Sequence, residues 1–284
     1  MNIRMILQEF AKGRLSIDDV EKKISVHSIE FAAGNIAQLD TAREVRKGIP
    51  EVVFGEYKSQ AEIMKIVNAI LRRNDSVVVS RIQKADLPKL VSLLRNKDLK
   101  VEVGKLSTTI LVSHKSFTIT KGMPKIGIIC AGTSDIGVAE ESRLIAKSMD
   151  CDSLISYDVG IAGLHRLFPA LRQMVEQDVE AIVVVAGMEG ALASVVSSMV
   201  NLPVIGVPTS VGYGFGSAGI AALASMLQSC TFGLVVVNID NGIGAGAFAA
   251  LIAKRLYTKG ADISIHKSAL QPVERKRFRT FKRL

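Results

Sequence analysis

Residues 181–208 read AIVVVAGMEGALASVVSSMVNLPVIGVP, and this stretch indicates the fold class. Two short apolar runs, 181–185 and 204–207, enclose a segment with helical length and composition, 191–199. Strands that alternate with helices of about ten residues predict right-handed crossovers and a parallel sheet covered by helices on both faces. The glycines, the serines and Glu189 argue against a membrane-spanning helix, which needs about 20 predominantly apolar residues.

The same alternation continues on both sides of this stretch, so one α/β sheet is expected to extend over residues 123–258. Each predicted strand is apolar, ends near a glycine or a polar residue, and is followed by a helical pattern. The predicted strands are 126–130, 153–156, 181–185, 204–207 and 234–238, and the predicted helices are 138–148, 164–177, 191–199, 220–227 and 247–256.

The chain before residue 123 differs, because long charged helical patterns dominate it. We expect a helical arm followed by a small α/β domain in residues 1–122, with residues 33–48 as a linker or arm. Its predicted helices are 3–11, 17–23, 60–71 and 84–94, and its predicted strands are 51–54, 76–79, 101–103 and 109–112.

Composition is typical of a folded globular protein, with 48% hydrophobic and 22% charged residues in 284. Three cysteines, an odd number, fit a reducing compartment, and no secretory signal is visible, so we expect a cytoplasmic protein. Much of the net charge of +9 lies in a basic tail, 259–284. We interpret the tail as a solvated terminal segment and expect neither a nucleic-acid nor a membrane partner.

Ligands of such sheets bind beyond the carboxyl ends of the strands, so the residues that follow each strand are the site candidates. Hydroxyl groups and backbone N–H groups after the first strand suit a phosphate, and the adjacent carboxylate suits ribose hydroxyls. The same residue types also favour a helix N-cap. The candidates for ligand binding are Gly132, Thr133, Ser134, Asp135, Asp158, Gly187, Tyr213 and Asn241.

Two further charged candidates have alternative explanations. Glu189 could act as a base or orient one, and it could equally favour a helix N-terminus electrostatically. His165 and Arg166 could bind an anion or lie on the surface. No metal-ligand constellation is visible in the sequence.

The cysteines and one glycine motif leave alternatives open. A lone cysteine is usually a small buried hydrophobe, which we expect for Cys130 and Cys151. Cys230 has polar neighbours and borders the strand-end region, although its place at a helix C-terminus counts against a reactive cysteine. Residues 214–219 match G-x-G-x-x-G and raise the alternative of a dinucleotide-binding dehydrogenase, but the motif starts seven residues after its strand.

The runs 186–192 and 202–208, together with the Ser134-Asp135 turn, resemble the PurE-type aminoimidazole ribonucleotide carboxylases. The resemblance covers residues 124–256 and implies a flavodoxin-like parallel sheet sandwiched by helices. Where that family carries a histidine after its Ala-Gly, this sequence has Ala193. Despite this difference, an aminoimidazole ribonucleotide carboxylase or mutase of purine biosynthesis is kept as the alternative function.

A resemblance that spans nearly the whole chain is to the LarB family of nickel-pincer cofactor biosynthesis. It rests on residues 132–135, 158–166, 186–190, 229–230 and 237–242, and on residues 50–55 of the first domain. The resemblance implies carboxylation of the pyridinium C5 of nicotinic acid adenine dinucleotide and hydrolysis of its phosphoanhydride. The products would be pyridinium-3,5-biscarboxylic acid mononucleotide and AMP.

The LarB resemblance also implies roles and partners. Cys230 would be the covalent nucleophile and Glu189 the base, and the candidates listed above, with His165 and Arg166, would bind substrate. CO2 or bicarbonate would be the co-substrate, with no tightly bound cofactor; whether magnesium takes part is not readable from the sequence. A homo-oligomer, an octamer as in PurE-like domains, would carry sites at subunit interfaces.

Overall fold

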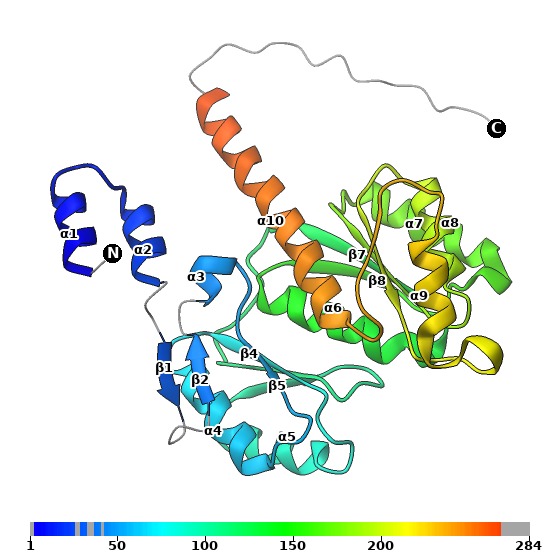
Figure 1. Ribbon diagram of the computed structural model, residues 1–284, viewed down its shortest axis with the longest axis horizontal. Coiled ribbons are helices and arrows are strands. Elements are labelled where there is room, and N and C mark those ends of the chain that lie inside the picture. Colours follow the sequence, from blue (N-terminus) through cyan, green and yellow to red (C-terminus); the bar gives the residue numbers. More distant parts are fainter. Residues whose placement is uncertain (1–2, 26–28, 33–36, 41–42, 268–284) are drawn as a thin grey trace.

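The computed structural model describes residues 3–25, 29–32, 37–40 and 43–267, and its second half is a parallel five-stranded sheet (Figure 1). The strand order is β11-β10-β9-β7-β8, the flavodoxin-like order expected from the PurE resemblance. The predicted α/β fold class is therefore confirmed. The strands are β7 (Lys125–Cys130), β8 (Asp152–Ser156), β9 (Ile182–Ala186), β10 (Val204–Pro208) and β11 (Leu234–Val236).

Helices cover both faces of this sheet because its strands are apolar on both faces. Val183 packs in one hydrophobic cluster with the first and last helices, and its neighbour Val184 packs in another with the middle three. The first face carries α6 (Ile136–Ser148) and α10 (Gly242–Lys267), and the second carries α7 (Leu167–Glu176), α8 (Ala191–Met199) and α9 (Ile220–Leu227).

The first half contains a four-stranded mixed sheet with the order β3-β4-β6-β5, in which β3 and β4 are parallel. Two helices cover its outer face, and a Ser59–Glu62 capping box begins the first of them. Its elements are β3 (Val52–Phe54), α4 (Gln60–Leu71), β4 (Ser76–Ser80), α5 (Leu87–Arg95), β5 (Lys100–Val103) and β6 (Ile110–Ser113).

Helix α6 lies between the two sheets and joins them (Figure 1). Val78 and Leu111 of the first sheet belong to the same buried cluster as the core of the second sheet. Beside them, the buried carboxylate of Glu141 accepts hydrogen bonds from Ser80 Oγ at 2.7 Å and Thr109 Oγ1 at 3.2 Å. Burial raises the pKa of this carboxyl above its usual range, against those hydrogen bonds.

In residues 33–48, where we expected a linker or arm, the part that the structure describes forms a strand and a short helix. Position 259, where we set the start of the tail, falls inside the long helix α10 (Gly242–Lys267), and residues 268–284 lie outside the described residues. The remaining elements of the first 50 residues are α1 (Ile3–Ala11), α2 (Ile17–Ser25), β1 (Ile29–Ala32), β2 (Ala37–Asp40) and α3 (Arg43–Lys47).

Candidate active site

A cavity of about 380 Å³ opens at the carboxyl ends of β7 and β9. The connections that leave these neighbouring strands run to opposite faces of the sheet, which makes this the switch point where ligands of such folds bind. Seven of the residues proposed from the sequence line it: Gly132, Thr133, Ser134, Asp135, Asp158, Gly187 and Glu189.

Asp135 forms the floor of the cavity and holds the turn after β7 in place. It is 4% exposed, and its carboxylate accepts hydrogen bonds from Thr209 Oγ1 at 2.7 Å and from the N–H of Gly132 at 2.9 Å. Burial raises the pKa of this carboxyl, the bond from Thr209 opposes the rise, and the charge of Asp240 adds to it. These contacts leave the exposed hydroxyls of Thr133 and Ser134, which have no partner among the described residues, as the groups available to a ligand.

The loop after β9 packs closely against the segment of Val211 and presents Glu189 to the cavity. A Cβ at Gly187 would lie 2.2 Å from the carbonyl oxygen of Val211, so only glycine fits there. The next residue, Met188, takes a left-handed conformation with φ of 52° and donates its N–H to the same carbonyl at 3.0 Å. Glu189 follows with an exposed carboxylate, which can reach a bound molecule without first breaking an internal bond.

Asp158 and Arg166 form an ion pair of 2.7 Å at one wall of the cavity. Asp158 also has a left-handed backbone, with φ of 56°, directly after the Tyr157 that follows β8. Arg166 and the exposed His165 belong to the short helix η2 (Ile161–Arg166), whose first two residues line the cavity. The pair is largely exposed, so its net contribution to stability is small, and the arginine can exchange this partner for an anionic ligand.

Two other candidates lie at the same edge of the sheet without lining the cavity. Tyr213 is 81% exposed and lies two residues beyond Val211, which does line it. Asn241 accepts a hydrogen bond from the N–H of Gly244 at 2.9 Å and so caps the first turn of α10.

The three cysteines differ in exposure. Cys130 and Cys151 are buried, and burial raises the pKa of their thiols to about 11 and about 12. Cys230 is exposed. This contrast makes Cys230 the most accessible thiol of the three.

The position of Cys230 differs from the expectation that it borders the strand ends that carry the site. Helix α9 returns from the carboxyl end of β10 to its amino end, and Cys230 follows that helix. The N–H of Val204, the first residue of β10, bonds to the carbonyl of Gly233 at 3.0 Å, which fixes this segment at the amino edge. Within one chain, Cys230 and the cavity therefore lie at opposite edges of the sheet.

The glycine motif at 214–219 does not form a dinucleotide-binding turn. It is the short helix η3 (Gly214–Gly219), whose Gly216, Ser217 and Ala218 depart from helical geometry, and it lines no part of the cavity described above. A Rossmann turn passes directly from the strand into the helix, so this geometry does not favour the dehydrogenase alternative.

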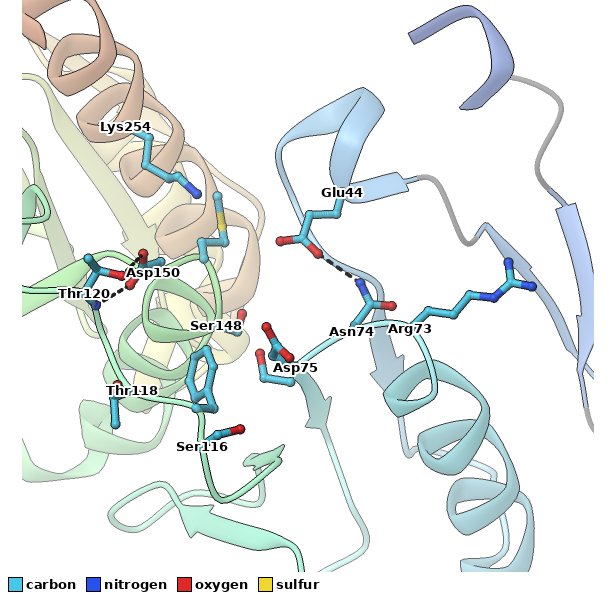
Figure 2. Close-up of a pocket in the computed structure, with 13 residues that line it drawn as sticks. Glu44, Arg73, Asn74, Asp75, Ser116, Thr118, Thr120, Ser148, Asp150 and Lys254 are labelled. Carbon is cyan, nitrogen blue, oxygen red and sulfur yellow. Dashed lines mark hydrogen bonds between the residues drawn. The ribbon is translucent and has the colours of Figure 1, made fainter. Parts of the chain in front are cut away.

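A second cavity of about 330 Å³ lies where β4 begins and α6 ends (Figure 2). Its walls are polar, but several of their groups bond to each other: Asn74 to Glu44 at 3.0 Å, and Thr120 to Asp150 at 2.8 and 2.9 Å. This second cavity lies at the opposite edge of the sheet from the strand ends that line the first cavity. The first cavity is therefore the candidate active site.

Sequence reasoning left out of the site Lys105, which lies over the ring of Tyr157. Thr209, which anchors Asp135, directly follows β10 and is among the residues that the strand-end rule selects, although the sequence assigned it no role. Lys105 comes from the other domain, and no sequence spacing signals its contact. In the part of the chain that the structure describes, no three His, Cys, Asp or Glu residues are grouped to hold a metal ion, and no helix is long and apolar enough to cross a membrane.

Comparison with known proteins agrees with this architecture. Residues 31–113 match a family model described as the LarB/PurE-like N-terminal domain, and residues 125–268 match one described as AIR carboxylase. An uncharacterized protein of Methanocaldococcus jannaschii is 45% identical over 90% of this chain and 98% of its own length. The N5-carboxyaminoimidazole ribonucleotide mutases of Thermotoga maritima and Pyrococcus abyssi are 30% and 31% identical over 46% of this chain, and over 75% and 72% of their own.

The fold, the strand-end cavity and these similarities define a PurE-like enzyme of the carboxylase or mutase type. The first domain makes the assignment narrower. The chain belongs to the LarB family, with a PurE-like carboxylase domain as its second half.

Proposed function

We propose that the protein carboxylates the pyridinium C5 of nicotinic acid adenine dinucleotide and hydrolyses its phosphoanhydride. The products would be pyridinium-3,5-biscarboxylic acid mononucleotide, a precursor of the nickel-pincer cofactor, and AMP. The observation that carries the proposal is the LarB-type domain at residues 31–113, ahead of the carboxylase domain. The two mutases described above each match less than half of this chain.

Substrate binding is assigned to the cavity at the ends of β7 and β9. The hydroxyls of Thr133 and Ser134, with the N–H groups of the turn, would bind the ribose phosphate of the nicotinate half. Arg166 would contribute a positive charge when it leaves Asp158. Asp135 is a positioning residue, because its carboxylate is buried beneath the turn.

The chemistry requires a nucleophile, since an electron-poor pyridinium ring cannot attack CO2. Addition of the Cys230 thiolate to the ring would place an electron pair in a dihydropyridine, whose C5 can then form a bond to the carbon of CO2. Glu189 would remove the proton from C5, the ring would regain aromaticity, and the carbon–sulfur bond would break to release the thiolate. Water attack on phosphorus would separately release AMP. CO2 or bicarbonate is the co-substrate in this scheme, and no tightly bound cofactor enters it.

We propose further that each site is completed by the Cys230 of another copy of the chain. A five-residue strand spans about 16 Å, so the two edges of the sheet are too far apart for Cys230 and Glu189 to act together within one chain. Exposed apolar side chains at both ends of α9 support assembly: Phe232 is 98% and Phe215 is 110% exposed. The oligomer would be the octamer that PurE-like domains form.

Incubation with nicotinic acid adenine dinucleotide and labelled bicarbonate, followed by mass spectrometry, tests the reaction. We expect labelled pyridinium-3,5-biscarboxylic acid mononucleotide, with AMP released at a comparable rate. The second candidate, aminoimidazole ribonucleotide carboxylation or the corresponding mutase reaction, is favoured by the AIR carboxylase match over residues 125–268. Robust turnover of aminoimidazole ribonucleotide, with none of the dinucleotide, would establish that candidate instead.

The role of Cys230 has its own test. Cys230→Ser should lower carboxylation by several orders of magnitude while substrate binding persists, because a serine hydroxyl is barely ionised at pH 7. Intact-mass analysis of the wild type with substrate should reveal a ring adduct, and peptide digestion should place it on Cys230. An adduct on Cys130 or Cys151, or near-wild-type carboxylation by the serine variant, would contradict the mechanism.

A further inference from the structure

The cavity described above has an acidic lining, which is unexpected for a site that takes a phosphorylated ligand. Asp135, Asp158 and Glu189 line it, and none of the described residues in its lining is a lysine, arginine or histidine. Arg166, at its rim, is already paired with Asp158 at 2.7 Å. Apart from Arg166, which would first have to leave Asp158, only backbone N–H groups and hydroxyls are available to balance the phosphate charge, so a further cation is expected beside the cavity.

Lys105 of the first domain is not among the lining residues of this cavity, but its ammonium contacts Tyr157, which precedes one of them. It belongs to the turn between β5 and β6, which packs against the start of α6: a Cβ at Gly137 would be 2.7 Å from the carbonyl oxygen of Leu106. Gly137 is two residues from Asp135 on the cavity floor. The Lys105 ammonium lies 4.8 Å from the centre of the Tyr157 ring, and Tyr157 directly precedes Asp158 in the cavity wall.

The charge of Lys105 is not neutralised by an ion pair. No salt bridge joins its ammonium to a carboxylate of the described chain, and the side chain is exposed. The carboxylate of Glu140, which accepts the Lys105 backbone N–H at 3.0 Å, is occupied by Arg143 at 2.7 Å and by the Tyr157 hydroxyl at 2.5 Å. Burial raises the pKa of Cys130, at the end of β7, and the charge of Lys105 makes a small contribution in the opposite direction.

We propose that Lys105 binds the ribose phosphate of the nucleotide in the cavity, together with Thr133 and Ser134. The first domain would then supply the cation that the second domain's own lining lacks. The inference rests on the proposed function only in requiring a ribose phosphate, which the dinucleotide and aminoimidazole ribonucleotide both carry. The flexible lysine stem can carry the ammonium from the Tyr157 ring to a phosphate oxygen, because a cation–π contact at an exposed site is weak.

Calorimetric titration of the full-length protein tests the assignment. Lys105→Met keeps the apolar stem and removes the charge, and Lys89→Met removes the same charge from an exposed position on α5. We expect Lys105→Met to weaken binding of nicotinic acid adenine dinucleotide by about 10- to 100-fold, with Lys105→Arg restoring most of it and Lys89→Met matching the wild type. Nicotinic acid riboside, which has no phosphate, should bind all four proteins equally.

If the wild type binds the dinucleotide, two results would overturn the assignment. One is wild-type affinity of Lys105→Met for the dinucleotide. The other is an equal loss of riboside affinity with a lowered melting temperature, which would show that Lys105 only holds the two domains together. If the wild type binds no dinucleotide, the proposed function fails separately, and the same comparison with aminoimidazole ribonucleotide and its riboside decides the role of Lys105. If the wild type binds neither nucleotide, both the proposed function and the assignment of Lys105 are overturned.

Discussion

Mixing two inactive variants gives the sharpest test of a site shared between copies of the chain. Glu189→Gln removes the proposed base, and Cys230→Ser removes the proposed nucleophile. Within one chain, the two residues are separated by the length of a strand, about 16 Å. A covalent nucleophile, in contrast, must approach the carbon that it attacks to about 3.5 Å. Only a site built from two chains can therefore bring an intact glutamate and an intact cysteine together in a mixture of these variants.

The expected magnitude follows from random assembly. If each site takes its glutamate from one copy and its cysteine from another, equal amounts of the two variants leave about one quarter of the sites complete. The assay is carboxylation of the dinucleotide by co-expressed variants purified through two different tags. Each variant alone and a mixture of wild type with the double variant are the controls. Activity no higher than that of the separate variants, in oligomers that contain both chains, would refute the shared site.

Three further outcomes are expected. Ser134→Ala should weaken nucleotide affinity about 10-fold or more by calorimetry, and unchanged affinity would show that the hydroxyl takes no part in binding. Thr209→Val should lower the free energy of unfolding by about 1–3 kcal/mol, because the buried Asp135 carboxylate loses its partner; an unchanged urea midpoint would contradict this. The raised pKa of Glu141 means that the folded state holds its proton more tightly than the unfolded state, so its stability contribution is complete below about pH 4.5 and is lost as the pH rises through the raised pKa. Glu141→Gln cannot ionise, so its urea midpoint should rise relative to wild type over that pH range, and a constant difference would oppose the assignment.

Most of the fold could be predicted because the strands of the second half are short, continuous apolar runs. Residues 182–186 and 204–208 pack on both faces, so their sequence has no polar alternation that could confuse the interpretation. The segment 33–48 lacks such a signal. Its strand β2 is four residues long and pairs with a strand nearby, and short pairs of this kind depend on tertiary packing more than on local propensity.

The site could be predicted in part, because topology brings strand ends together whatever the intervening sequence. That rule found the turn at 132–135 and the loop of Glu189. It could not show that Asp135 would be buried, since its partner Thr209 is 74 residues away. It also could not show the contribution of Lys105, which depends on how the two sheets pack across α6.

The packing of α6 between both sheets has a consequence for the independence of the two halves. Removal of residues 1–122 would expose the side of α6 that covers Val78 and Leu111, and would leave the Glu141 carboxylate without its two hydroxyl donors. The carboxylase half is thus not a self-sufficient module, although sequence comparison delimits it cleanly at residues 125–268. Heating the whole chain should give one cooperative calorimetric transition, with both halves melting together.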